Sequence, residues 1–415
     1  MTHRILIVCY YFPPLGLAGV TRPLQLFKHL SKIGCECHVL TVKPVAYYAY
    51  EPELLEGTDQ TRMHRAGSRD PSRLLYLCGV RAVSSRSASA SGRFGSSVFP
   101  DSKRGWIEPA VRLGLKLVDR HRFDFILSTS PPVSAHVVAS RIAKRTGVKW
   151  VADFRDLWST RSIEDTYSNA KLVQRAQQFR DELRNAASAV TAVNRSIAEY
   201  VGNAEVITNG FDPELAKQWS ERPDAERFVI GLLGTFNDQL PVEPLLNCLA
   251  DLRRRSESNW NRVRLVQVGR VDRDWLLDQL TPYGLADQCD MYGLQTRERT
   301  VKLLSAASLF YIGIGERHED RITPARTYDL LASGRPIIAY SRPDSELATL
   351  IGKNSGNVVF SGENAAPVVK AIEHLLSKHA AGHLRFEPIP EYAKNYSWEN
   401  IAAQFVAMFD RLGES

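Results

Sequence analysis

The sequence predicts an α/β protein with two Rossmann-like domains, each built on a parallel sheet. Three observations support this: strand-like apolar runs alternate with helical patterns, the alternation pauses once at a polar stretch, and 415 residues exceed one ordinary core. A strand, a helix and a strand at this spacing form a right-handed βαβ unit. We therefore expect domains at residues 1–212 and 228–388, a linker at 213–227, and a final helical segment, 389–415, that returns to the first domain.

In the first domain, the expected strands are apolar runs, and the helices carry apolar residues on one face. The expected strands span residues 4–11, 37–42, 123–129, 148–154, 189–193 and 205–209. The expected helices span residues 21–33, 107–121, 133–146, 169–187 and 196–201. Gly34 and Gly147 follow two of these helices and act as end signals.

The second domain repeats the pattern. Its expected strands span residues 228–234, 263–269, 289–293, 308–314, 336–340 and 356–360. Its expected helices span residues 242–255, 275–280, 296–307 and 365–378, with a further helix before Gly334. A last helix at 397–412 has an apolar face of its own and is the segment expected to dock on the first domain.

The composition excludes several classes of protein. A hydrophobic content of 44% and a charged content of 24% are typical of soluble globular proteins. No apolar run reaches the ~18 residues of a membrane span, and no cleavage site follows the first strand, so we expect a cytoplasmic protein. The six cysteines form neither a CxxC pair nor a Cys/His zinc spacing, which argues against a disulfide framework and a structural metal.

The charge is uneven along the chain. Residues 1–200 carry 29 Lys and Arg against 17 Asp and Glu, and residues 61–122 alone carry 13 against 4. The basic insertion at about 61–106 also holds aromatic residues and a Ser/Gly-rich run. It is either a solvated loop or a surface for an anionic partner. No nucleic-acid motif accompanies it, so an acidic membrane surface at the inner face is the preferred partner and nucleic acid is not expected.

Two groups of polar or glycine residues follow strands of the first domain. Gly16 and Gly19 lie between a strand and a helix, where backbone N–H groups can approach an anion. The alternative is that these glycines only allow the chain to turn. Asp153, Arg155 and Asp156 leave another strand together. A carboxylate there would orient or deprotonate a hydroxyl and the guanidinium would hold a phosphate; the alternative is an ion-pair network between loops.

In the stretch "RITPARTYDLLASGRPIIAY", the position of Arg326 near the start of a helix needs an explanation. With Thr323 as N-cap and Pro324 next, Arg326 falls in the first turn, where the helix dipole disfavours a positive charge. Arg326 and Asp329 share one helix face and either form a local ion pair or bind a ligand. If Arg326 binds an anion and Asp329 accepts from a pair of hydroxyls, the ligand has a phosphate at one end and a sugar at the other.

Six motifs carry a family resemblance. They are "ILIVCYYFPPLGLAGVTRP", "FPDSKRGW", "STSPPVSAH", "KWVADFRDLW", "TNGFDP" and "TPARTYDLLASGRPIIA". In this order and at these distances they resemble the family 4 glycosyltransferases of the GT-B fold. The resemblance implies retaining transfer of a sugar from a nucleotide sugar, such as a UDP- or GDP-sugar, to a glycan or lipid-linked acceptor. It also implies that no metal cofactor is required.

The resemblance assigns roles by position. It places Asp329 on the ribose hydroxyls, Arg326 on the phosphates, Gly16 and Gly19 near the distal phosphate, and the 153–156 group beside the donor sugar. The complete implied donor set is Gly16, Gly19, Gly234, Thr235, Asn237, Arg270, Glu319, Arg326, Thr327 and Asp329. His136 and Trp106 are the expected acceptor contacts, although a structural role for His136 is the alternative.

The chain also departs from the family pattern. Arg321 stands where the first carboxylate of a paired motif is expected, with Glu319 and Asp320 beside it. "GTFND" replaces an Arg and Lys pair after the first strand of the second domain. Two alternatives to transfer therefore stay open: a sugar-nucleotide epimerase or phosphorylase of the same fold, and a degenerate subunit that binds a nucleotide sugar without turnover.

Overall fold

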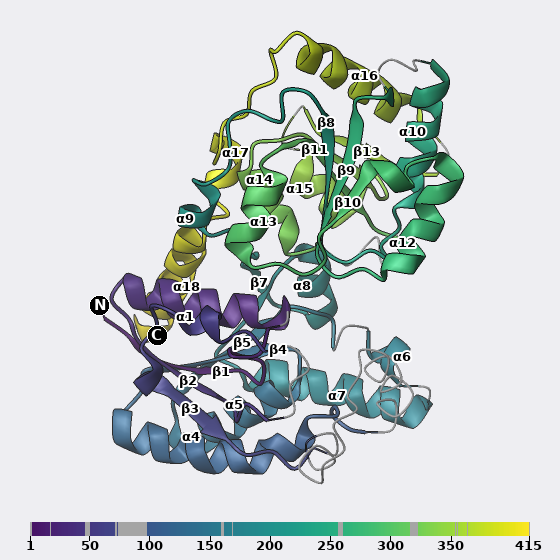
Figure 1. Cartoon of the computed structure of the whole chain (residues 1–415). Helices are drawn as coiled ribbons and strands as arrows, with labels where there is room; N and C mark the ends of the chain where they lie inside the picture. The colour runs from purple at the N-terminus through teal and green to yellow at the C-terminus, as the bar shows by residue number, and fades with distance from the viewer. Residues whose placement is uncertain are drawn as a thin grey trace. The chain divides into compact units, whose positions relative to one another are not determined.

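The computed structural model describes residues 2–16, 18–45, 50–70, 73, 98–158, 162–167, 169–255, 260–315, 323–352, 354, 356–362 and 364–414. The chain divides into two compact units, each a parallel sheet covered by helices (Figure 1). Unit 1 consists of residues 1–208 and 398–415, and unit 2 of residues 209–397. The predicted fold class is confirmed.

Unit 1 has a seven-stranded sheet in the order β3-β2-β1-β4-β5-β6-β7, and every pairing is parallel. The strands are β1 (Arg4–Val8), β2 (Glu36–Val42), β3 (Met63–Ala66), β4 (Phe125–Ser130), β5 (Lys149–Phe154), β6 (Ala189–Ala192) and β7 (Glu205–Val206). The order reverses at β1, and ligands of open α/β sheets bind where the carboxyl ends of strands meet at such a point.

The helices of unit 1 cover both faces of its sheet. They are α1 (Thr21–Lys32), α4 (Ile107–His121), α5 (Ser134–Thr146), α6 (Ile163–Thr166), α7 (Ala170–Ala186), α8 (Arg195–Val201) and α18 (Trp398–Glu414). Short 3₁₀ turns are η1 (Ala18–Val20), η2 (Pro52–Leu55), η3 (Gln60–Arg62) and η4 (Arg104–Trp106). Alternate residues of β1 enter the two cores, with Leu6 in the core of α4 and α5 and Ile5 in the core of α1 and α18.

Unit 2 has a six-stranded parallel sheet in the order β10-β9-β8-β11-β12-β13. The strands are β8 (Phe228–Leu233), β9 (Val263–Val268), β10 (Cys289–Met291), β11 (Ala307–Gly313), β12 (Ile337–Tyr340) and β13 (Val358–Phe360). The helices and 3₁₀ turns are α9 (Pro213–Ala216), α10 (Glu243–Arg255), α12 (Arg273–Leu280), η5 (Thr281–Tyr283), η6 (Ala286–Gln288), α13 (Arg297–Leu304), α14 (Arg326–Ala332), α15 (Glu346–Ile351), α16 (Ala366–Ala380) and α17 (Glu391–Lys394).

The stretch 213–227 differs from the expected linker because much of it is bound to unit 2. Asp212 caps α9 by accepting from two backbone N–H groups, and Trp219 is buried in a core of this unit. Further along, the Asp224 carbonyl accepts from the His379 Nε2 at 2.6 Å. The boundary accordingly falls between residues 208 and 209 rather than after 212.

The last helix returns to unit 1, as the sequence predicts. The apolar face of α18 is buried in the core that contains α1, and it includes Ile401, Phe405, Met408 and Phe409. Of the basic insertion, the structure describes residues 61–70, 73 and 98–106, and the remainder lies outside the described residues. None of the helices in the described ranges has the length and apolar character needed to cross a membrane.

Candidate functional site

Two glycines bring backbone segments of unit 2 close together at the carboxyl ends of β8 and β9. Gly234 follows β8 with φ +104° and Gly269 follows β9 with φ +128°, a region that side chains other than glycine rarely adopt. The Gly234 N–H donates to the Val268 carbonyl at 2.7 Å. A Cβ atom on Gly269 would lie 2.5 Å from the Gly234 carbonyl oxygen. Both loops are therefore held tightly at this edge.

Arg326 lies against this edge from the first residue of α14. Its Nη1 would lie 2.6 Å from a Cβ on Gly234, and its guanidinium carbon is 5.8 Å from the centre of the Phe236 ring. The Nε and Nη2 atoms are buried and have no hydrogen-bond partner among the described residues. Burial lowers the pKa of Arg326 to about 10, so the side chain stays protonated at pH 7. The site thus holds an uncompensated cation, which favours an anionic ligand.

The start of α14 corrects one detail of the prediction. The N-cap is Ala325 rather than Thr323, and no side chain caps this end. The helix begins at Arg326 itself, two residues later than the Pro324 start expected from the sequence. The predicted donor position Glu319 and its neighbour Arg321 lie within residues 316–322, which are outside the described residues.

Asp329 and Thr327 add acceptors on the same helix. The Asp329 side chain is 28% exposed and is 3.3 Å from Arg297 of α13. Burial raises the pKa of Asp329, and Arg297 opposes that shift. The Thr327 hydroxyl is buried without a hydrogen-bond partner in the described part of the chain. One turn of helix therefore offers a cation, a hydroxyl and a partly open carboxylate.

The other predicted donor residues have different surroundings. Thr235 is half-buried in the loop after β8. Asn237 is exposed, and its side-chain oxygen accepts from the backbone N–H groups of Gln239 and Leu240 at 2.9 and 3.0 Å. Arg270 is exposed at the end of β9. In the present conformation Asn237 shapes the loop.

In unit 1, Asp153 is a buried structural anchor, which corrects its predicted catalytic role. Its two oxygens accept from the Arg22 Nε and Nη2 at 2.9 and 2.8 Å, and the hydroxyls of Thr129 and Thr191 donate to it. Burial alone would raise the pKa of Asp153, but Arg22 and the two threonines hold it below its usual value. The fully buried carboxylate cannot contact a sugar without disrupting this network.

Arg155 is also satisfied within unit 1, which corrects its predicted phosphate role. Its Nε donates to the Ser130 carbonyl at 2.8 Å, its Nη1 to the Gly19 carbonyl at 2.6 Å and its Nη2 to the Pro131 carbonyl at 2.9 Å. A guanidinium that joins two loops through three carbonyls has no free edge for a bidentate phosphate. Arg155 is a loop anchor.

Asp156 is the member of this group that remains available. It is half-buried, and no described residue donates a hydrogen bond to its carboxylate. Burial raises the pKa of Asp156 to about 6, while Arg155 opposes the shift. A carboxylate with a pKa near the working pH, at the carboxyl end of β5, is suited to accept a proton or a hydrogen bond from a hydroxyl.

The glycine loop of unit 1 has an acidic neighbour. A Cβ on Gly16 would collide with the Glu51 side chain, whose Oε1 would be 2.2 Å away. A Cβ atom on Gly19 would lie 3.6 Å from the Tyr11 ring. The Gly19 carbonyl accepts a hydrogen bond from Arg155. A carboxylate beside Gly16 disfavours an anion there, so this structure gives no support to phosphate binding at Gly16.

His136 and Trp106 belong to the core, which corrects their predicted acceptor role. Both are fully buried. The His136 Nδ1 is 2.8 Å from the Ser128 hydroxyl, which also accepts from the Trp150 Nε1 at 2.7 Å. Burial lowers the pKa of His136 to about 3. The Trp106 ring packs edge-on against Tyr10 at 5.5 Å.

Sequence reasoning missed a buried polar group beside Trp106. The Tyr10 hydroxyl donates to the fully buried Asp70 at 2.5 Å, and Arg73 donates to the Lys43 carbonyl at 2.6 Å. An isolated acid within the basic insertion was the signal that would have identified Asp70. Phe236, beside the Arg326 guanidinium in unit 2, was also missed, since an apolar loop residue carries no distinctive pattern.

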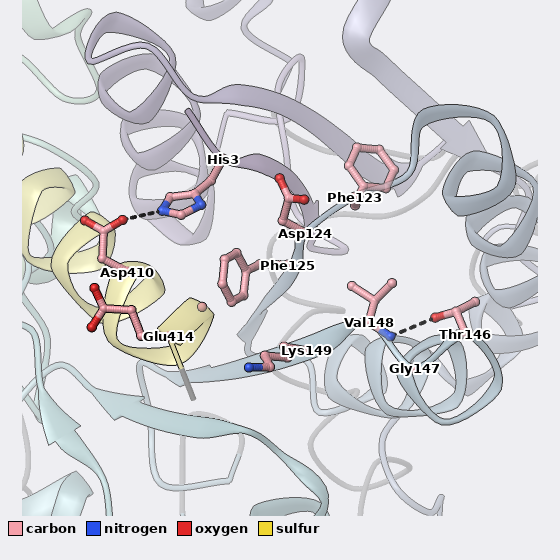
Figure 2. A pocket seen from close by; sticks show the side chains of 11 residues that line it. His3, Phe123, Asp124, Phe125, Thr146, Gly147, Val148, Lys149, Asp410 and Glu414 are labelled. Atoms are coloured by element: carbon pink, nitrogen blue, oxygen red, sulfur yellow. Dashed lines mark hydrogen bonds and ion pairs between the residues drawn. The ribbon is translucent and has the colours of Figure 1, made fainter. Parts of the chain in front are cut away.

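A hollow of about 540 Å³ lies at the opposite, amino edge of the unit 1 sheet (Figure 2). His3, Phe125 and Lys149 line it at the starts of their strands, together with Asp410 and Glu414 of α18. Figure 2 shows His3 bonded to Asp410 across one wall, at 2.8 Å. Since ligands of open α/β sheets bind at the carboxyl edge, we do not assign chemistry to this hollow.

Comparisons with known proteins agree with this layout. Residues 18–209 match the family model of the glycosyl transferase 4-like domain. No curated protein sequence matches the chain at a significant level.

Solved structures resemble the chain along its whole length. Sucrose-phosphate synthase from Thermosynechococcus elongatus has a TM-score of 0.69 at 14% identity, covering 99% of both chains. A glycosyltransferase from Rickettsia africae has a TM-score of 0.66 at 12% identity, covering 99% of this chain and 98% of its own. The Anabaena protein HepE in complex with UDP and glucose has a TM-score of 0.62 at 15% identity, covering 98% and 99%. At these identities the likeness shows the fold.

Proposed function

The chain carries a glycosyl transferase 4-like domain on the GT-B fold, and from this premise we propose that it is a retaining glycosyltransferase. It moves a sugar from a nucleoside diphosphate sugar to a hydroxyl of a glycan or lipid-linked acceptor, in the synthesis of a surface polysaccharide or glycoconjugate. The family and fold predicted from the motifs are confirmed by the same comparisons.

The observation that carries the proposal is the unpartnered guanidinium of Arg326. Its Nε and Nη2 are buried without a partner among the described residues, and Gly234 leaves no side chain beside its Nη1. A buried cation without a partner costs free energy, and a diphosphate that accepts hydrogen bonds from two parallel N–H groups would compensate it. Arg326 is therefore the proposed donor phosphate contact.

The nucleoside end of the donor would lie at the next residues of α14. The Asp329 carboxylate keeps an exposed fraction of 28% and makes only long contacts with Arg297, at 3.3 and 3.5 Å. It can thus accept from the two hydroxyls of a ribose. The UDP bound by the Anabaena protein HepE supports a uridine donor, with a guanosine donor as the alternative.

In the proposed reaction, the bond between the anomeric carbon and the diphosphate oxygen breaks, and a bond from the acceptor oxygen to that carbon forms on the same face. The acceptor proton passes to the departing diphosphate. Arg326 stabilises the charge that develops on that group, which is the kind of electrostatic effect that dominates many enzymes. We propose that this arrangement needs no metal cofactor for transfer.

The acceptor side is proposed to use Asp156 of unit 1. Its carboxylate is free of hydrogen bonds from described residues and has a raised pKa, so it would accept a hydrogen bond from an acceptor hydroxyl. The basic segment 61–122 is proposed to contact an anionic membrane surface where a lipid-linked acceptor resides. Nucleic acid is not a proposed partner.

The test is release of nucleoside diphosphate from UDP- and GDP-sugars in the presence of a membrane extract, with the anomeric configuration of the product read by NMR. Arg326→Ala should lower kcat/KM about 100- to 1000-fold, as loss of one transition-state donor does. Arg254→Ala, at an exposed arginine of α10 paired with Asp251, is the matched control and should leave turnover unchanged.

Two results would overturn the proposal. Unchanged turnover in Arg326→Ala would remove its role at the phosphates. Tight binding of a nucleotide sugar by the native chain without release of diphosphate, across a panel of acceptors, would replace transfer by a binding role.

A further inference from the structure

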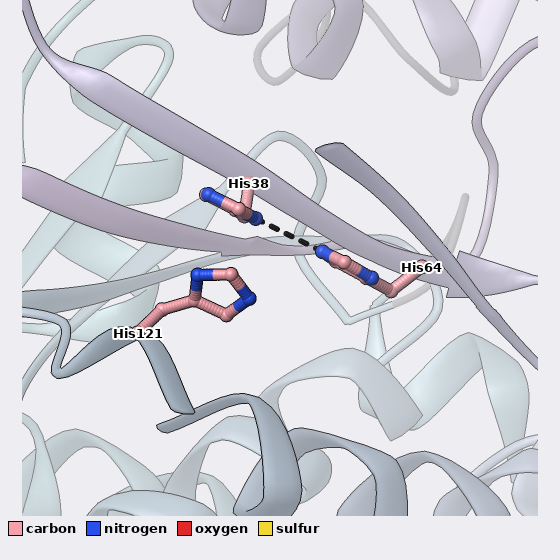
Figure 3. A group of neighbouring side chains, drawn as sticks. All are labelled: His38, His64 and His121. Atoms are coloured by element: carbon pink, nitrogen blue, oxygen red, sulfur yellow. Dashed lines mark hydrogen bonds between the residues drawn. The ribbon is translucent and has the colours of Figure 1, made fainter. Parts of the chain in front are cut away.

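Three histidines from separate elements of unit 1 meet at the amino edge of its sheet (Figure 3). His38 lies near the start of β2 and His64 near the start of β3, and His121 is the last residue of α4. His64 pairs with Leu40, two residues beyond His38, so both histidines point to the same face of the sheet. Because α4 runs opposite to the strands, its last residue arrives where the strands begin.

The ring nitrogens are close enough to share one ligand. The His38 Nδ1 and the His64 Nε2 are 2.9 Å apart, and one ligand atom from each of the three rings lies within 4.8 Å of the others. Nitrogens bound to one tetrahedral zinc ion at 2.0–2.1 Å are separated by about 3.3 Å. Figure 3 shows the three imidazoles gathered with His121 turned toward the pair. A small rotation of His121 would complete three-nitrogen coordination.

The surroundings provide an orienting carboxylate and an apolar wall. The Glu36 Oε1 is 3.3 Å from the His38 Nε2, which leaves the Nδ1 facing the cluster; a carboxylate on the far nitrogen is how metal-bound histidines are commonly held. The buried Phe123 packs against His38 at 5.3 Å and His121 at 5.8 Å. Of the nearby arginines, Arg62 is already paired with Asp59 and Arg4 donates to the His121 carbonyl at 3.3 Å. Arg120 is the positive charge that a cation would face.

We propose that His38, His64 and His121 form a binding site for one zinc-class divalent cation, with a water as the fourth ligand. Three imidazoles favour zinc and its neighbours over magnesium or calcium, which prefer oxygen ligands. The site lies at the edge of the unit 1 sheet opposite to Asp156, so its role is structural. A bound metal would tie the edge strand β3, where the basic insertion begins, to β2 and α4.

The experiment is a titration of the full, untagged native chain with Zn²⁺ alone, followed by calorimetry and by the thermal midpoint. We expect one ion per chain and a rise of about 5 °C or more at a hundredfold excess over Kd. Mg²⁺ at the same concentration should have no effect. Co²⁺ should give the intense visible absorption of a four-coordinate nitrogen-rich site rather than the weak bands of an octahedral one.

Matched variants locate the site. His121→Gln and His64→Gln, at half-buried positions, should each weaken Zn²⁺ binding at least about 100-fold, because losing a metal ligand costs more than losing a residue that hydrogen-bonds to a ligand. His374→Gln, at an exposed histidine of α16, should bind like the native chain. The proposal is overturned if the native chain takes up no stoichiometric Zn²⁺, in which case His38 and His64 are simply a hydrogen-bonded pair. It is also overturned if His121→Gln binds Zn²⁺ as tightly as the native chain does. Should a variant fail to fold, the native stoichiometry and the Co²⁺ spectrum still decide.

Discussion

Arg155 of unit 1 and Arg326 of unit 2 occupy similar places, each beside the carboxyl edge of a parallel sheet, and they differ in what satisfies them. The guanidinium of Arg155 donates to three backbone carbonyls. That of Arg326 leaves Nε and Nη2 buried without a partner among the described residues. The comparison teaches that a cation at a strand end indicates ligand binding only where the protein does not already satisfy it.

The largest stability effect is expected at Arg155. Arg155→Met removes three charge-assisted hydrogen bonds between two loops and should lower the free energy of unfolding of unit 1 by about 3 kcal/mol. Urea denaturation of the full chain measures this, with hydrogen exchange in β4 and β5 assigning the transition to unit 1. Arg141→Met, at an exposed arginine paired with Glu108, is the control and should change stability by less than about 0.5 kcal/mol. A near-neutral Arg155→Met would break the comparison.

An intermediate effect is expected at Asp156, the free carboxylate beside Arg155. Its raised pKa means that the folded state binds a proton more tightly than the unfolded state, so this group stabilises below about pH 4 and loses that contribution as pH rises through about 6. At pH 7 the free energy of unfolding of Asp156→Asn should exceed that of the native chain by on the order of 1 kcal/mol, after allowance for partial exposure. At pH 4 the two should be equal.

The pH profile of that difference is the measurement, because the histidines with lowered pKa values act equally in both proteins. Asp119→Asn on the exposed face of α4 provides the control and should show no such profile. A constant difference between pH 4 and pH 7 would show that Asp156 titrates normally.

The smallest stability effect is expected at Arg326. Arg326→Met replaces an uncompensated buried cation by an apolar side chain beside Phe236. The free energy of unfolding should therefore fall by less than about 0.5 kcal/mol, or rise. The same substitution should lower kcat/KM about 100- to 1000-fold, which sharpens the contrast with Arg155. Thermal unfolding with and without UDP separates the two effects, since only the native chain should be stabilised by the nucleotide. A loss of several kcal/mol would mean that Arg326 has a structural partner.

The fold was predictable because buried parallel strands appear in the sequence as apolar runs separated by helical patterns. The stretch 213–227 was harder. Its charged composition hides Leu215 and Trp219, which are buried in a core of unit 2, and a polar segment with a few anchoring residues looks like a linker in the sequence. Burial of those residues depends on partners far along the chain, which local patterns do not contain.

The sequence indicates where the candidate site residues lie, but not which of their polar groups already have hydrogen-bond partners. A helix start drew attention to Arg326 and Asp329, and a strand end to Asp156. The same strand end also selected Asp153, whose partner Arg22 lies 131 residues earlier. His38 and His64 are 26 residues apart and meet only because β2 and β3 pair, so no zinc spacing was visible. Long-range pairing decides which polar groups are free, and one sequence does not reveal it.

The placement of α18 has a consequence for how the protein is made. Trp398 and Phe405 share a core with Ile5 of β1 and with α1, so the part of this face that α18 covers stays open until α18 is synthesised. The roughly 190 residues of unit 2 take about 10 to 40 seconds to translate, and unit 2 is continuous in sequence. Unit 2 can therefore fold on the ribosome before unit 1 is complete, although unit 1 begins first. During that interval the apolar surface that α18 later covers is available to chaperones.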